Sequence, residues 1–498
     1  MGRWFGSAAV LFGVVLFGGC GGGGGGGNGI DAGPVFFAVP LSSSTGRTID
    51  VVLHNLDTRS TTVDLTAYKP NGVSYGAGST VTLDGNDVAV VDVLTVLGAP
   101  IAGGVLYART LSRNVEVTFD ASDPAKDAAD ASRGFPFAFD LAAPPPGPFR
   151  TGVNATTLTT QIELVNASNA AQPITVTAYE ESLVDPSAPP VAHVVALAPF
   201  APAESRTFTP ASLSGIAGFV GSFLVEGALP VAAMAEEDLA FDVPAVATHD
   251  RTMVAAVSYG RDPLTTLPTF LDFAIVVRND ADVARAISLN RISNEAGSAL
   301  YGSARSIALA AHEARVVTTT DAPLLDLFGD VLSAGSLSRV SFELSVPAGV
   351  DVGFRQFEPQ LLVANTNLRP TPTGHVALVT DVWPEASTAS TVRNWLAVVN
   401  PTASTITVVV EAAIPEPAGF DATFDSIATL TIPAHARLTI SPDGTVYENR
   451  DHVAVLTIGV RLRSAAPFAA TAWRETRTVA HAVQTLVDLP VRSYDDGE

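Results

Sequence analysis

A segment that ends in asparagine and has the pattern of a β-strand occurs four times along the 498-residue chain. Its asparagines are Asn55, Asn166, Asn279 and Asn400, and successive copies are 111, 113 and 121 residues apart. Recurrence on this scale is typical of repeated structural units that each build a separate core. The sequence therefore predicts four modules of one kind in tandem.

Side chains alternate within each of these segments. The second and fourth residues before the asparagine are aliphatic in every copy, whereas the residue directly before it is His54, Val165, Arg278 or Val399. A period of two with one apolar face predicts a half-buried strand of an antiparallel sheet, with the variable position facing away from the core. Several such strands per module predict a β-sandwich.

The modules resemble the immunoglobulin-like sandwiches that occur in tandem on many bacterial surface proteins. The resemblance covers residues 35–492 by strand pattern. It implies an all-β fold of four tandem immunoglobulin-like antiparallel β-sandwich modules. The expected modules are residues 35–134, 135–250, 251–372 and 373–498, and the last contains a closing strand at 485–491.

The N-terminal segment, residues 1–19, has the layout of an export signal, since Arg3 precedes a ten-residue apolar run that is too short to span a bilayer. The stretch from Leu16 to Cys20 resembles a bacterial lipoprotein lipobox, with Phe17 in place of the usual leucine. The resemblance implies cleavage before Cys20 and acylation of Cys20, and the alternative is an ordinary secretory signal with an incidental cysteine. Residues 20–34 are rich in glycine and are expected to form a flexible tether.

Composition excludes several classes of function. The formal net charge of −22 argues against nucleic acid as a partner and against docking on anionic lipid headgroups. A hydrophobic content of 47% excludes a disordered acidic chain. Cys20 is the only cysteine, so the chain cannot form an internal disulfide or a thiolate metal cluster.

Two short motifs favour structure over chemistry. The stretch from Gly72 to Gly76 matches the G-x-S-x-G pattern of α/β-hydrolases, but it lies between two predicted strands and no helix follows, which favours a hairpin loop. His312 and His435 occupy similar places in the third and fourth modules. A repeated position of this kind favours a turn residue over a ligand.

An acidic segment is the one candidate for a cation site. It contains Asp120, Asp123, Asp127 and Asp130, with Lys126 in its middle. Calcium needs six to eight oxygen ligands, and the segment matches no EF-hand pattern. A solvated acidic loop is therefore favoured, and the sequence leaves calcium binding near Asp123 open.

Trp395 and Trp473 are the candidate ligand-binding residues. Trp395 stands where the sister strands carry Asp50, Gln161 and Ala274, and Trp473 falls where Asp120 and Glu236 stand. By parity Trp395 faces away from its own core. An exposed pair of indoles would suit a sugar or a protein partner, and the alternative is burial against a neighbouring module or the final strand.

These observations predict a non-enzymatic, lipid-anchored structural or adhesion protein, without cofactor or metal. The membrane would be contacted through the lipid on Cys20, and a surface protein or polysaccharide would be the further partner. The expected location is the bacterial cell envelope, at the outer membrane or cell surface. The alternative is a carbohydrate-binding surface protein that uses the aromatic residues of the fourth module.

Overall fold

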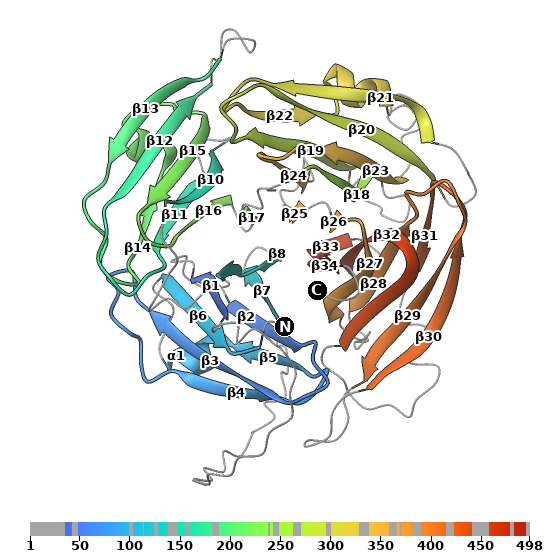
Figure 1. Ribbon diagram of the computed structural model, residues 1–498, viewed down its shortest axis with the longest axis horizontal. Helices are drawn as coiled ribbons and strands as arrows, with labels where there is room; N and C mark the ends of the chain where they lie inside the picture. The colour runs from blue at the N-terminus through green and yellow to red at the C-terminus, as the bar shows by residue number, and fades with distance from the viewer. Residues whose placement is uncertain are drawn as a thin grey trace, which may run out of the picture. The chain divides into compact units, whose positions relative to one another are not determined.

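The computed structural model of the chain describes residues 35–41, 48–98, 103–112, 114–123, 128–137, 148–155, 160–181, 189–237, 240–242, 249–261, 270–294, 300–327, 338–357, 366–368, 371–382, 390–414, 423–440, 458–478 and 483–494. The fold is nearly all β, as the sequence predicts. Its antiparallel sheets repeat in four modules, which Figure 1 colours in turn from blue through green and yellow to red. Each module has a lead sheet, which contains its first strand, and an asparagine sheet, which contains the strand leading to the asparagine.

Module one has the lead-sheet order β4-β3-β6-β1-β9 and the asparagine-sheet order β5-β2-β7-β8. A short helix, α1 (Val93–Leu97), is capped by Asp92 at its start. The lead-sheet strands are β1 (Val35–Leu41), β3 (Thr61–Tyr68), β4 (Ser79–Leu83), β6 (Gly104–Thr110) and β9 (Phe135–Phe137). The asparagine-sheet strands are β2 (Thr48–Asn55), β5 (Val88–Asp92), β7 (Val115–Asp123) and β8 (Ala128–Arg133).

Module two has the orders β10-β15-β12-β13 and β14-β11-β16-β17, and Thr209 caps the short helix α2 (Pro210–Ser214). Its lead sheet has β10 (Phe149–Ala155), β12 (Ile174–Glu180), β13 (Val191–Ala196) and β15 (Gly221–Gly227). Its asparagine sheet has β11 (Gln161–Asn166), β14 (Ser205–Phe208), β16 (Val231–Glu237) and β17 (Ala240–Asp242). Because β9 pairs with β1, Phe135–Phe137 belongs to the lead sheet of module one, and β10 is the equivalent of β1.

Module three repeats the pairing scheme. Its lead sheet has β18 (Arg251–Arg261), β20 (Arg285–Asn294), β21 (Leu300–Leu309), β23 (Ser338–Val346) and β26 (Thr371–Pro372). Its asparagine sheet has β19 (Phe270–Asn279), β22 (Ala314–Thr318), β24 (Val350–Phe357) and β25 (Thr366–Leu368).

Module four uses one long strand, β32 (Ile458–Thr478), in both of its sheets. The other lead-sheet strands are β27 (Gly374–Val382), β29 (Ile406–Ile414), β30 (Thr423–Ile432) and β34 (Val491–Tyr494). The asparagine sheet adds β28 (Ser390–Val399), β31 (Ala436–Ile440) and β33 (Val483–Leu489). The single closing strand expected at 485–491 is instead divided at Pro490, since β33 pairs with β32 in one sheet and β34 pairs with β27 in the other.

The repeated asparagine fixes the same turn in each module, and all four side chains are fully buried. Each side-chain amide donates to the carbonyl four residues on, in Arg59 (2.7 Å), Ala170 (2.9 Å), Val283 (2.8 Å) and Ser404 (2.7 Å). Each also donates to the carbonyl at the start of the turn that joins the lead sheet to the asparagine sheet, in Asp84 (2.8 Å), Ala201 (2.8 Å), Ala310 (2.7 Å) and Pro433 (2.8 Å). The asparagine therefore ties two loops together from inside, which satisfies backbone carbonyls that would otherwise be costly to bury.

The turn between the two sheets that the asparagine holds has one residue in the left-handed region. This αL position is occupied by Asn86, Ala203, His312 and His435, with φ of 58°, 56°, 60° and 51°. The turn role predicted for His312 and His435 is thus confirmed, and it extends to all four modules. Asparagine and histidine tolerate this conformation better than most residues, whereas alanine is strained there.

Successive modules pack through one pair of faces. The residue before each asparagine faces away from its own core, as predicted, but it is buried on the lead-sheet face of another module, so the strand is buried on both faces rather than half-buried. We name the contacts by module: contact 1–2, contact 2–3, contact 3–4 and contact 4–1. The four pairs are Val165 with Ala38, Arg278 with Gly152, Val399 with Val254, and His54 with Gly459.

Contact 4–1 joins modules that are distant in sequence. Arg474 forms a buried ion pair with Asp120 at 2.9 Å, and Arg492 bonds Glu116 at 3.1 Å. The last strands of the four asparagine sheets, β8, β17, β25 and β33, also contact one another.

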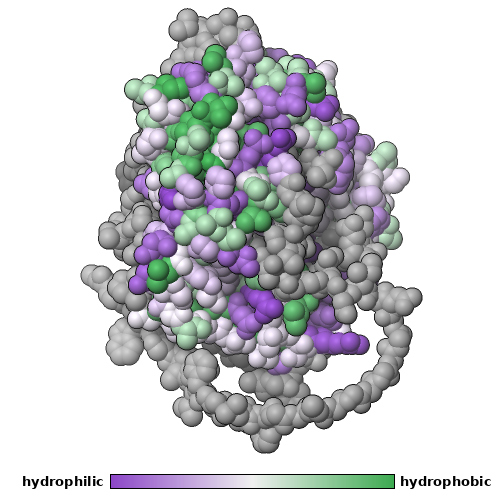
Figure 2. Space-filling model, turned by 60° about the vertical axis from the view of Figure 1, so that its left-hand side comes forward, coloured by the Kyte–Doolittle hydropathy of each residue, from purple (hydrophilic) through white to green (hydrophobic). Residues whose placement is uncertain are grey.

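Edge strand β13 departs from the polar-outward pattern, because Val191 and Val194 are exposed. Figure 2 views the side that carries module two and shows hydrophobic residues gathered between hydrophilic ones.

Candidate functional site

The two candidate tryptophans meet at contact 3–4. Trp395 pairs directly with Trp473 across β28 and β32, and their rings stack at 6.2 Å between centroids. The register agrees with the sequence alignment, since Asp50 pairs with Asp120 and Gln161 with Glu236 in the sister modules. Trp473 is only 2% exposed, and the partly buried Trp395 packs with it in a cluster that includes Ala256 of module three. The pair therefore serves as packing between modules.

The other sequence candidates are placed as follows. Cys20 lies outside the described residues, as does Asp127 of the acidic segment. Asp120 is buried on β7, where its carboxylate forms an ion pair with Arg474. Within the part of the chain that the structure describes, no three histidine, cysteine or acidic residues are grouped to hold a metal. Ser74 lies in the loop between β3 and β4, and a strand rather than a helix follows, as predicted.

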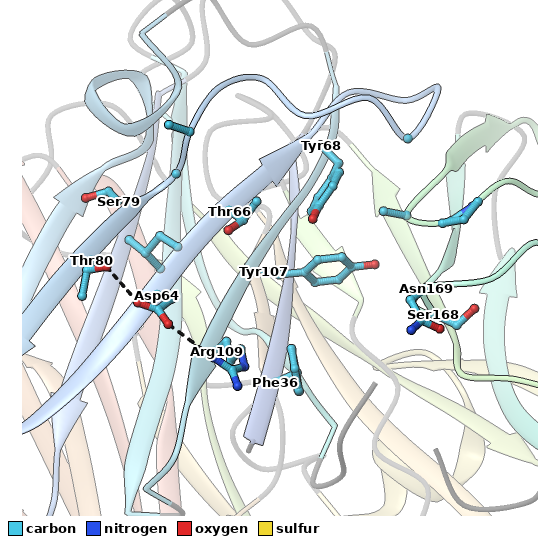
Figure 3. Close-up of a pocket in the computed structure, with 16 residues that line it drawn as sticks. Phe36, Asp64, Thr66, Tyr68, Ser79, Thr80, Tyr107, Arg109, Ser168 and Asn169 are labelled. Carbon is cyan, nitrogen blue, oxygen red and sulfur yellow. Dashed lines mark hydrogen bonds and ion pairs between the residues drawn. The ribbon is translucent and has the colours of Figure 1, made fainter. Parts of the chain in front are cut away.

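A groove at contact 1–2 is the candidate site, and residues from both modules line it. Its volume is about 800 Å³, which lies in the range of small-molecule sites. The floor is the outer face of the module-one lead sheet, and the wall comes from Ser168, Asn169, Pro202 and Ala203 of module two. Figure 3 shows the Tyr107 ring pointing across the groove toward Ser168 and Asn169.

The strand register arranges the floor in rows. Phe36, Arg109, Asp64 and Thr80 stand directly opposite one another on β1, β6, β3 and β4. The neighbouring row contains Tyr107 and Thr66. These residues alternate along their strands with core residues such as Leu65, so the packing of the core fixes which side chains face the groove.

Charge in the groove is balanced and accessible. Arg109 and Asp64 form an ion pair at 3.5 Å, with both side chains about half exposed. The Thr80 hydroxyl donates to Asp64 at 2.8 Å, and the Arg109 guanidinium lies 5.8 Å from the centre of the Phe36 ring. The pair therefore offers both donors and acceptors to a ligand without a large net charge.

Two tyrosines form the end of the groove that touches module two. The Tyr68 and Tyr107 rings are 5.6 Å apart and tilted by 57°. The Tyr107 hydroxyl donates to the Asn166 carbonyl at 3.4 Å, and burial raises the pKa of Tyr107. Tyr107 is therefore held by the contact, whereas Tyr68 is only partly buried and lines the groove.

The sequence alone does not predict this groove, because its residues come from two different modules. A signal was nevertheless present. Asp64, Thr66 and Tyr68 occupy the outward positions of an alternating strand, and Ala203 stands at the position that holds histidine in modules three and four.

No family model and no curated protein matches the chain. Among the described residues, the helices are all too short or too polar to pass through a bilayer.

Proposed function

We propose that the chain is a non-enzymatic, lipid-anchored protein of the bacterial cell envelope, located at the outer membrane or the cell surface. Acylated Cys20 would hold it at the membrane, and the glycine-rich residues 20–34 would separate the anchor from the folded modules. The modules would have a structural or adhesive role and present their surfaces to a polysaccharide or a surface protein.

The single observation that supports this role best is the structural use of the repeated polar residues. The four asparagines tie loops together, and the αL residues shape the turns that join the two sheets of each module. Repeated modules with such turns, joined through equivalent faces, are suited to holding surfaces in fixed positions. The lipobox-like stretch before Cys20 supplies the independent support for anchoring.

The aromatic residues of module four do not favour the carbohydrate alternative. Trp473 is buried, and Trp395 packs against Trp473 and Ala256 at contact 3–4. A sugar would have to separate two modules before it could stack on this pair. The burial of the two tryptophans therefore favours a packing role.

The anchoring proposal is tested with Cys20→Ser in the full chain. We expect this variant to lose incorporation of labelled fatty acid and to leave the membrane fraction or remain unprocessed. Phe17→Leu is the matched control, since it restores the usual lipobox residue and should be labelled at least as well as wild type. Equal labelling and fractionation of Cys20→Ser and wild type would refute the anchor.

A further inference from the structure

Contact 2–3 shows what fills the space that is open at contact 1–2. There, the His312 ring of module three stacks on Tyr179 of module two at 4.3 Å, with 11° between the ring planes. The same imidazole forms a hydrogen bond with the Asp282 carboxylate at 2.9 Å. A flat ring with polar atoms on its edge thus occupies this part of the contact.

The two contacts are equivalent residue by residue. Tyr68 and Tyr179 each lie thirteen residues after their asparagine, and each pairs with the strand that neighbours the first strand of its lead sheet, β6 or β15. Ala203 and His312 both occupy the αL position, with φ of 56° and 60°. At contact 1–2 the alanine has no ring to stack on Tyr68, and the groove lies beside both residues.

The remaining lining is chemically complementary to a polyhydroxyl ligand. Thr66, Ser79, Thr80 and Asn169 supply hydroxyl and amide groups, and the Asp64–Arg109 pair supplies a charged acceptor and donor. A saccharide ring has an apolar face for an aromatic side chain and hydroxyls at its edge for such groups. An aromatic peptide side chain would use the ring of Tyr68 but has no row of hydroxyls to match these polar groups.

We propose that the groove at contact 1–2 binds a neutral saccharide of two or three sugar units, with one ring against Tyr68 in the place that His312 takes at contact 2–3. The paired charges of the floor and the net charge of −22 disfavour an acidic sugar. The site goes beyond the anchoring role, and it is independent of whether Cys20 is acylated.

Binding is tested on the mature full-length protein in detergent by saturation-transfer NMR and calorimetry. The probes are cellotriose, maltotriose, chitotriose and mannotriose, with trigalacturonate as the acidic comparison. We expect at least one neutral trisaccharide to bind and trigalacturonate to bind at least tenfold more weakly. Binding of no neutral probe, or preference for trigalacturonate, would overturn the proposal while leaving the anchoring result untouched.

Ala203→His is the decisive variant, because it should place an imidazole on Tyr68 as in module three. We expect it to weaken saccharide binding at least tenfold. Ala203→Gly is the matched control: it keeps the αL turn and the open groove, and it should bind like wild type. Equal binding by Ala203→His and Ala203→Gly would show that the sugar lies elsewhere.

Asp64→Asn provides a second variant that does not alter the contact between modules. Asp64 is half exposed, so we expect the fold and the thermal transition to stay as in wild type. Loss of the charged acceptor beside Arg109 should weaken neutral saccharide binding about tenfold or more, as expected for a lost hydrogen bond to a charged group. Unchanged affinity would exclude the floor of the groove as the site.

Discussion

Contacts 1–2 and 2–3 use equivalent strands and equivalent positions on them, yet they differ in the side chains that lie between the modules. At contact 2–3 the fully buried Arg278 and the stacked His312 fill the interface with charged and aromatic groups. At contact 1–2 the equivalent residues are Val165 and Ala203, and a groove lies at the edge. A common backbone arrangement therefore produces a filled contact or an open one according to two side chains.

The two contacts also differ in how buried charge is treated. Arg278 has carboxylate partners in Asp280 at 2.7 Å and Asp351 at 3.5 Å. Contact 1–2 instead contains Glu163, whose pKa burial raises to about 8, although a hydrogen bond with Ser205 opposes the shift. Contact 2–3 compensates the charge of Arg278 with carboxylates, whereas burial at contact 1–2 favours the neutral form of the Glu163 carboxyl.

The largest expected effect separates the contacts by charge. Arg278→Ala should lower the free energy of unfolding by about 3–5 kcal/mol, because it removes the cation between buried Asp351 and its neighbours. Val165→Ala, at the equivalent position, should cost only about 1–2 kcal/mol of apolar burial. Urea denaturation of both variants measures the difference. Equal losses would mean that Arg278 contributes only packing.

The sequence predicted what each module determines alone. Alternation of side chains located the asparagine strands, and repeated position identified the turn role of His312 and His435. The alignment of Trp395 with Asp50, Gln161 and Ala274 predicted a register that the strand pairings confirm. These features depend on local geometry, which repeats with the chain.

The same approach could not predict which outward faces are buried. Val165, Arg278 and Trp395 face away from their own cores, and only the neighbouring module decides their surroundings. Periodicity within one module contains no information on that partner. The groove could not be predicted for the same reason. It results from a small residue, Ala203 of module two, opposite Tyr68 of module one.

A change in pH should weaken contact 1–2 through Glu163. Its pKa is about 8 in the folded protein against an ordinary 4.5, so its contribution is complete below pH 4.5 and is lost as the pH rises to about 8. The loss should be at most about 5 kcal/mol, since the pKa rises by about 3.5 units and one unit corresponds to about 1.4 kcal/mol.

Glu163→Gln isolates this contribution. The difference in unfolding free energy between wild type and variant should change steadily from pH 4.5 to 8 and stay constant outside that window. Taking the difference cancels other groups, including His54, whose pKa burial and then Arg461 lower to about 3 and which destabilises the fold toward acid between pH 6.5 and 3. A difference independent of pH would show that Glu163 is ionised in the folded protein.

The smallest expected effect compares the two αL positions directly. Ala203→Gly should raise the free energy of unfolding by roughly 0.5–1 kcal/mol, because glycine adopts a φ of 56° without the strain that a Cβ causes. His312→Gly relieves less strain, because histidine tolerates this conformation better than alanine, and it loses the stack on Tyr179 and the hydrogen bond with Asp282. Its unfolding free energy should therefore fall by about 1 kcal/mol.

Opposite signs for the same substitution at equivalent turns are the result that the comparison requires. Thermal and urea unfolding of the two variants, each against wild type, would measure them. If both glycine variants were stabilised, relief of backbone strain would outweigh the His312 stack. The His312 ring would then make no net contribution to the stability of contact 2–3. If both were destabilised, Ala203 would have a packing role against Tyr68 that offsets its strain, and contact 1–2 would be less open than the groove indicates.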